Sequence, residues 1–266
     1  NMYIDTHIHA FTESIAQRAL DRLSEAAKIT PSTDGTLAGT VKLLDESGVD
    51  YGVMLPIATK PSQQRTINDW AKSVSGGKII SFGTVHPYAE DAVEETERVH
   101  SLGLKGLKFH NDHQGVFLFD EKCLPIYKKC EQLGLPIVFH MGYDPISPFV
   151  HRAMPYDLLW LHEKCPRLKI IGAHMGGMQA WEAVHHYIAG VPNIYLDTAC
   201  MAGNIDEGMF AAIVKKHGCD RILFGSDLPW STPKREMELV DRLPITDDQK
   251  DRIFCRNAIE LLGLNV

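Results

Sequence analysis

Short apolar segments rich in Val, Ile and Phe alternate with longer segments of helical periodicity along the chain. Within one longer segment, Leu37, Val41 and Leu44 recur at the spacing that places side chains on one face of a helix. Strands that alternate with helices in this way predict βαβ units and a parallel sheet. The helices are then expected to pack on the outside of the sheet.

The number of apolar segments indicates the architecture. Each candidate strand is followed by a segment with helical periodicity, and no low-complexity linker interrupts the series. We expect these units to close into a (β/α)8 barrel, the TIM barrel, because an open doubly wound sheet usually has fewer strands. The candidate strands are residues 2–9, 51–57, 79–85, 104–110, 136–141, 168–174, 194–199 and 221–227.

The chain length agrees with one barrel. The sequence has 266 residues, and a barrel of this kind typically takes about 250 residues as a single domain. We therefore expect one domain over residues 1–266. The segment after Thr246 predicts one extra C-terminal helix that ends near Leu262.

Composition and charge narrow the partners. The sequence is 44% hydrophobic and 23% charged, as in ordinary globular proteins. A net charge of -7 without a run of Lys or Arg argues against nucleic acid or anionic lipid as a binding partner. No apolar stretch approaches the ~20 residues that span a membrane. Six cysteines without CxxC spacing predict reduced thiols and a cytoplasmic protein. A homodimer is the default expectation.

Titratable residues stand at the ends of several predicted strands, where barrels of this type carry their active sites. His7 and His9 end the first strand and, being two residues apart, point to the same side. His140 ends the fifth strand, His174 the sixth, and Asp227 the eighth. Imidazole and carboxylate ligands suit a borderline ion such as zinc. The pattern predicts a catalytic metal site at the mouth of the barrel.

Three local motifs carry a family resemblance: Asp-Thr-His-Ile-His at residues 5–9, Lys-Gly-Leu-Lys-Phe-His at residues 105–110, and Gly-Ser-Asp-Leu-Pro at residues 225–229. With the histidines of strands five and six, they resemble the amidohydrolase superfamily over nearly the whole chain, in the amidohydrolase-related branch that includes aminocarboxymuconate semialdehyde decarboxylase. The resemblance implies that one divalent metal, zinc or alternatively manganese, is held by His7, His9, His140 and Asp227. It makes His174 either the catalytic base or a residue that supports the metal ligands from behind.

Four further residues are candidates for substrate binding. Lys108 and His110 share one face of the fourth strand, where they either hold a substrate carboxylate, ligate a second metal, or fill the polar upper layer of the barrel. Arg152 lies in residues 142–154, the longest loop at the catalytic face, and is either a partner for an anionic substrate or a surface arginine. Trp230 either walls the pocket or packs in the core. Asp197, in strand seven, is either a second carboxylate in the site or a structural acceptor near the rim, and the structural interpretation is preferred.

The ligand set is compatible with more than one function. The first hypothesis is a hydrolase in which a metal-activated water attacks a small amide, lactone or ester, and Asp227 or His174 accepts the water proton. The alternative is a nonoxidative decarboxylase of an unsaturated or aromatic acid, which needs a substrate carboxylate near the metal. A noncatalytic metal-binding barrel is the second alternative. In the first two cases the partner is a small molecule.

Overall fold

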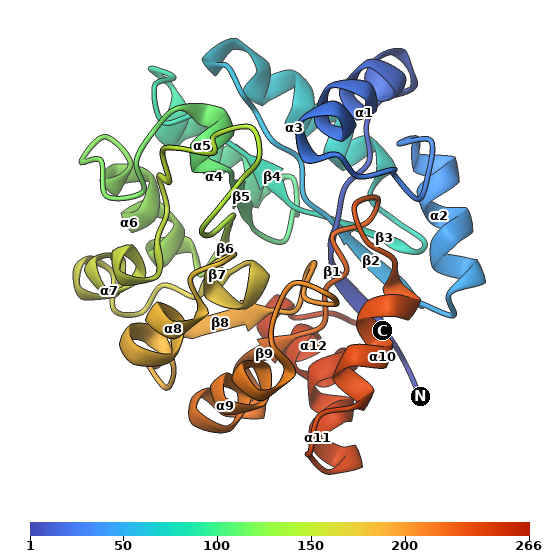
Figure 1. The fold of residues 1–266 in the computed structure, drawn as a ribbon. Helices are drawn as coiled ribbons and strands as arrows, with labels where there is room; N and C mark the ends of the chain where they lie inside the picture. The colour runs from blue at the N-terminus through green and yellow to red at the C-terminus, as the bar shows by residue number, and fades with distance from the viewer.

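Parallel strands form the wall of a barrel in the computed structural model, which describes residues 1–266 (Figure 1). Every pair of neighbouring strands is parallel, as the alternating pattern predicted. In chain order the strands are β1 (Ile4–Ile8), β2 (Tyr51–Met54), β3 (Ile79–Ser81), β4 (Gly83–Thr84), β5 (Leu107–Phe109), β6 (Ile137–Phe139), β7 (Ile170–Gly172), β8 (Ile194–Asp197) and β9 (Ile222–Leu223).

The predicted third strand is divided in the structure. Its first part, β3, pairs with β2, and its second part, β4, pairs with β5. Phe82 separates the two parts, and its backbone N–H donates to the carbonyl of Met54 at 3.0 Å, while the N–H of Gly83 donates to the carbonyl of Gly106 at 2.8 Å. These hydrogen bonds continue the wall from one sheet to the next, so eight barrel positions remain.

The barrel closes where the first and last strands meet. The N–H of Thr6 donates to the carbonyl of Phe224, and the N–H of Asp227 donates to the carbonyl of His7, both at 2.8 Å. An isolated parallel bridge joins Ile8 to Leu228. The start and the end of the chain therefore share one seam, and the candidate ligands of β1 lie beside the segment after β9.

Helices surround the strands (Figure 1). Helix α10 begins where the sequence predicted, with Pro233 in its first turn and the Thr232 hydroxyl accepting from the N–H of Arg235 at 3.4 Å. The α-helices are α1 (Glu13–Ala27), α2 (Leu37–Glu46), α3 (Gln64–Val74), α4 (Ala92–Ser101), α5 (Asn111–Gln114), α6 (Leu124–Leu133), α7 (Pro155–Lys164), α8 (Trp181–Ala183), α9 (Glu207–His217), α10 (Pro233–Asp241), α11 (Asp247–Asp251) and α12 (Asn257–Leu262). Shorter 3₁₀ and π turns are η1 (Pro61–Gln63), η2 (His174–Gly176), η3 (Val184–Ile188), η4 (Cys219–Arg221) and η5 (Arg252–Arg256). None of these helices is both long and apolar enough to cross a membrane.

The apolar core has two parts. A large outer cluster, with members such as Phe109 and Phe139, packs strands against the surrounding helices. A smaller inner cluster includes Val53, Val138 and Ile171 and takes in Leu262 of α12. The predicted extra C-terminal helix is thus present as α11, η5 and α12, and its last part packs against the inner strands. This cluster fills the end of the barrel interior that α12 covers, and polar side chains can occupy the opposite end.

Candidate metal centre

His7 and His9 present their Nε2 atoms to the same point at the end of β1. His7 donates from Nδ1 to Oδ2 of Asp197 at 2.8 Å, and His9 donates from Nδ1 to the carbonyl of Leu55 at 2.9 Å. Because both partners are acceptors, each ring carries its proton on Nδ1 and a lone pair on Nε2. The two Nε2 atoms lie 3.2 Å apart. Burial lowers the pKa of His7 to about 4, which keeps this ring neutral.

Asp227 completes this group of acceptors. Its Oδ1 lies 3.4 Å from Nε2 of His7 and 3.1 Å from Nε2 of His9. Its other oxygen, Oδ2, accepts from the thiol of Cys200 at 3.3 Å, and the residue adopts a φ of 66° just beyond β9. Three acceptor atoms thus converge with no proton between them, an arrangement that is favourable when a cation lies among them.

The spacing of these atoms fits a divalent metal. Tetrahedral sites with bonds of about 2.0–2.1 Å to nitrogen and oxygen have ligand atoms about 3.3–3.4 Å apart. The convergent acceptors of His7, His9 and Asp227 lie 3.1 to 3.4 Å from one another. The donor set therefore suits the borderline ion that the sequence predicted.

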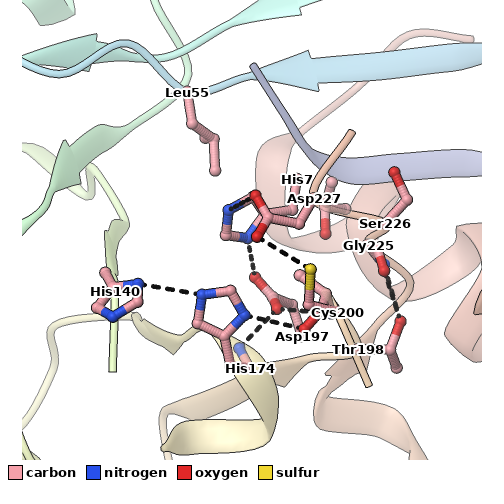
Figure 2. Close-up of polar contacts among 12 residues, drawn as sticks. His7, Leu55, His140, His174, Asp197, Thr198, Cys200, Gly225, Ser226 and Asp227 are labelled. Carbon is pink, nitrogen blue, oxygen red and sulfur yellow. Dashed lines mark hydrogen bonds and ion pairs between the residues drawn. The ribbon is translucent and has the colours of Figure 1, made fainter. Parts of the chain in front are cut away.

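His174 and His140 extend the site. His174 donates from Nδ1 to the carbonyl of Ala199 at 2.9 Å, and its Nε2 lies 3.1 Å from Nδ1 of His140. One ligand atom each of His174, His7 and Asp227 lie within 4.8 Å of one another. The structure therefore places His174 next to the convergent acceptors of His7, His9 and Asp227. His140 contacts His174 (Figure 2).

Asp197 has a larger part in this arrangement than its sequence position suggested. It is fully buried at the end of β8. While Oδ2 accepts from His7, Oδ1 accepts from the backbone N–H groups of His174 and Ala199, both at 3.0 Å. Figure 2 shows this carboxylate between the two histidines. Its place at a strand end was the one signal in the sequence.

Lys108 is buried without a hydrogen-bond partner for Nζ. Burial lowers its pKa to about 8, although the carboxylates of Asp197, Asp227 and Asp144 oppose the shift. A buried ammonium without a hydrogen-bond partner lacks the contacts that normally compensate a structural lysine. This favours the substrate-binding interpretation of Lys108 over a filling role.

The other candidate substrate residues are engaged in local contacts. His110 lies against Asp144, with Nε2 3.3 Å from Oδ2. Arg152 donates to the Ser147 hydroxyl at 3.0 Å and lies over the ring of Phe117, so its guanidinium is tied to its own loop. Trp230 is half-buried, and its backbone N–H donates to the carbonyl of Asp227 at 2.8 Å.

Two residues near the site were not anticipated. Asp144 and His113 form a second buried group with His110 and His140. Both lie outside the strands, His113 in α5 and Asp144 in the loop after β6. No strand-end position marked them in the sequence.

A family comparison identifies the chain. The family model described as Amidohydrolase matches residues 4–264. The chain belongs to the amidohydrolase family. No curated protein sequence matches it.

Solved structures share the fold of this amidohydrolase. The 2,6-dihydroxybenzoate decarboxylase from Rhizobium is 18% identical with a TM-score of 0.74, and 100% of each chain is covered. A dihydroxybenzoic acid decarboxylase from Polaromonas sp. JS666, with bound manganese and the inhibitor 2-nitroresorcinol, is 20% identical with a TM-score of 0.70, covering 100% of this chain and 98% of that one. The 4-oxalomesaconate hydratase from Rhodopseudomonas palustris is 19% identical with a TM-score of 0.69, covering 98% and 96%.

Proposed function

We propose that this amidohydrolase is a metal-dependent decarboxylase of a small unsaturated or aromatic carboxylic acid. The observation that carries the proposal is Lys108, a buried ammonium without a hydrogen-bond partner whose pKa responds to Asp197 and Asp227 of the metal centre. Decarboxylation requires an anionic carboxylate in this region, and a desolvated ammonium attracts one strongly. Two structures with the same fold are decarboxylases of aromatic acids, which supports the reaction class.

In this proposal His7, His9, His140 and Asp227 hold one divalent metal. When bound, the metal supplies Lewis-acid polarisation of a substrate oxygen. Zinc fits the nitrogen and oxygen donors, and manganese is supported by the relative from Polaromonas that contains it. His140 would ligate through Nδ1, because its Nε2 donates to the carbonyl of Tyr143 at 3.2 Å.

His174 is the proton donor in the proposed reaction. Its Nδ1 is committed to the carbonyl of Ala199, so Nε2 is the nitrogen that exchanges protons. Nε2–H protonates the carbon that bears the carboxylate, and the carbon–carboxylate bond then breaks. The electron pair of that bond restores the carbon–carbon double bond, carbon dioxide leaves, and His174 recovers a proton from solvent. Lys108 holds the substrate carboxylate before it departs.

Hydrolysis of a small amide, lactone or ester is the second candidate, favoured by the family to which the chain belongs. His174 Nε2 would then accept the proton of the attacking water. Asp227 is less suited to this role, because Oδ1 faces His7 and His9 while Oδ2 accepts from Cys200. A noncatalytic metal-binding barrel is the remaining alternative.

An isotope experiment separates these reactions. The metal-loaded protein is incubated with unsaturated and aromatic carboxylic acids, and separately with lactones, esters and amides, in water that contains deuterium and oxygen-18. A decarboxylase releases carbon dioxide and leaves one deuterium on the product carbon without oxygen-18. Incorporation of oxygen-18 into the product would instead establish hydrolysis, and turnover of neither panel would count against both reactions.

Matched alanine variants test the division between the two histidines. We expect His140→Ala to lose bound metal, and His174→Ala to retain it while losing turnover. Elemental analysis after chelator-free purification measures the first effect. If His140→Ala retained bound metal and His174→Ala lost it, His174 would be the metal ligand and His140 the proton donor. This outcome is worth testing because His174 lies close to His7 and Asp227.

Three further proposals concern the cellular location, the number of domains and the assembly of the enzyme. We propose a cytoplasmic protein, because all six cysteines are free and buried. Residues 1–266 would form one domain, since the family match spans most of the chain. A homodimer remains the default assembly for a protein of this class.

A further inference from the structure

A second group of buried side chains lies outside the convergent acceptors of the metal centre. Asp144 is placed between two imidazoles, with Oδ2 3.3 Å from Nε2 of His110 and Oδ1 3.4 Å from Nε2 of His113. The ring of His110 stacks on His113 with centroids 3.6 Å apart, and on His140 with centroids 4.1 Å apart. Asp144 belongs to the 142–154 loop, whereas His110 and His113 belong to the segment that follows β5.

Hydrogen bonding indicates that this group is not a second metal site. Nδ1 of His110 accepts from the backbone N–H of His113 at 3.3 Å, so the proton of the neutral His110 ring lies on Nε2 and faces Asp144. One ligand atom each of His110, His140 and Asp144 lie within 4.8 Å of one another. However, Nε2 of His140 donates to the carbonyl of Tyr143, so the Nε2 atoms of both histidines carry protons and are donors in this group. Asp144 is therefore an acceptor that attaches its loop to the β5 segment.

The attachment lies next to a contact with the metal centre. Tyr143 precedes Asp144, and its carbonyl accepts from Nε2 of His140 at 3.2 Å. That hydrogen bond decides which nitrogen of His140 is available to a metal. The loop is also closed at its base, where the N–H of Gly142 donates to the carbonyl of Ala153 at 2.8 Å. At its tip, Phe149 is 94% exposed.

From these contacts we infer that Asp144 is a positioning residue for the proposed metal ligand His140. It acts through the carbonyl of Tyr143 and also directly, since its Oδ2 lies 3.9 Å from Nε2 of His140. The inference rests on the proposed role of His140. With Asp144 attached to His110 and His113, the Tyr143 carbonyl fixes the proton of His140 on Nε2 and leaves Nδ1 free. When Asp144 is detached, Tyr143 keeps the hydrogen bond from its N–H to the carbonyl of Met178 at 3.0 Å but loses the anchor that follows it in the chain, so His140 is oriented less firmly. Attachment of the loop therefore strengthens metal binding, and by linkage metal binding strengthens attachment of the loop by the same free energy.

The test compares Asp144→Ala with a control at the other end of the loop. The control is Asp112→Ala, because the Asp112 carboxylate accepts from the backbone N–H of Arg152 at 2.9 Å, near the end of the loop opposite Tyr143. Titration calorimetry with Mn²⁺ measures affinity, and chymotrypsin cleavage after Phe149, identified by mass spectrometry, measures loop attachment in the metal-free protein. Asp144→Asn, which keeps the side-chain shape and an acceptor oxygen, accompanies both.

We expect Asp144→Ala to weaken Mn²⁺ binding about 10–100-fold, the usual effect of removing a group that orients a ligand, and to accelerate cleavage after Phe149. Asp144→Asn should restore part of the affinity. Asp112→Ala should accelerate cleavage while leaving Mn²⁺ affinity unchanged, and Mn²⁺ should slow cleavage of the wild-type loop.

Three outcomes would overturn the inference or its basis. Equal Mn²⁺ affinity of wild type and Asp144→Ala would overturn the positioning role alone. Equal loss of affinity in Asp112→Ala and Asp144→Ala would assign the effect to general loosening of the loop, and would also overturn the inference. Absence of Mn²⁺ and Zn²⁺ binding by the wild-type protein would instead contradict the proposed metal-dependent function.

Discussion

At the scale of single residues, Asp197 contacts both His7 and His174 through one carboxylate. One oxygen fixes the proton of His7, and the other holds the backbone of His174, which has the positive φ of 58°. Left-handed backbone at a residue other than glycine persists where surrounding contacts hold it in place. Asp197 therefore orients a proposed metal ligand and the proposed proton donor together.

The variant Asp197→Asn tests this role. We expect its affinity for Zn²⁺ or Mn²⁺ to fall about 10–100-fold, because the amide group cannot accept from His7 and from the His174 backbone through two oxygens. Titration calorimetry gives the affinity. Asp157→Asn is the control, since Asp157 is a buried acceptor for the N–H of Met154 at 2.8 Å, at the start of α7. Unchanged metal affinity in Asp197→Asn would show that His7 is oriented without this carboxylate.

Lys108 provides a second residue-scale prediction, in which stability and activity change in opposite directions. Its pKa falls from 10.5 to about 8 on folding, so the buried charge destabilises the protein below pH 8, and this cost disappears as the pH rises from 8 to 10.5. Lys108→Met should therefore stabilise the protein by about 2–3 kcal/mol at pH 7, measured by urea unfolding, while turnover of a carboxylic acid is lost. Lys105→Met, on the same segment but half-buried, should change neither. Full activity in Lys108→Met would remove Lys108 from the substrate site.

At the scale of elements, Glu236 of α10 connects the loops that follow β8 and β9. Its Oε2 accepts from the N–H groups of Met201 and Ala202 at 3.1 and 2.8 Å, and its Oε1 accepts from the Ser231 hydroxyl at 2.6 Å. These loops also carry Cys200 and Asp227. Helix α10, outside the barrel, thus helps to position the two loops that follow β8 and β9.

Glu236→Gln should change how stability depends on pH. Burial raises the pKa of Glu236 from 4.5 to about 7, so the folded state binds a proton more tightly than the unfolded state, and stability falls as the pH rises from 4.5 to 7. Glutamine can keep all three contacts without a charge. We expect Glu236→Gln to match wild type near pH 4.5 and to exceed it by about 2–3 kcal/mol at pH 8, measured by urea unfolding. The same difference at both pH values would contradict this account.

Elements also show what the sequence could and could not reveal. The barrel strands were predictable because each is a short apolar run bounded by helical periodicity. The candidate site residues were visible where such a run ended in His9, His140 or Asp227. The division of the third strand into β3 and β4 was not predictable, because it depends on whether each backbone N–H and carbonyl pairs with β2 or with β5. Asp144 was not visible either, since its contact with His110 forms between two loops that sequence periodicity does not relate.

At the scale of the whole molecule, the metal centre lies across the seam that closes the barrel. His7 lies in β1, His9 directly follows that strand, and Asp227 follows β9. Backbone hydrogen bonds join these ends, including that from Asp227 to His7 at 2.8 Å. A bound ion adds a bond between the beginning and the end of the chain, so metal binding is expected to stabilise the whole barrel and not one loop.

Thermal unfolding measures this stabilisation. A ligand at about 100–1,000 times its Kd contributes about 2.7–4.1 kcal/mol, and each kcal/mol shifts Tm by about 2–4 °C in a domain of roughly this size. Saturating Zn²⁺ or Mn²⁺ should therefore raise the Tm of the metal-free protein by roughly 5–15 °C, and a chelator should reverse the shift. The double variant His7→Ala, His9→Ala should show no such increase, because the seam then keeps its backbone hydrogen bonds but lacks two of the acceptors that converge with Asp227. A comparable increase in the double variant would mean that the stabilising ion binds elsewhere in the protein.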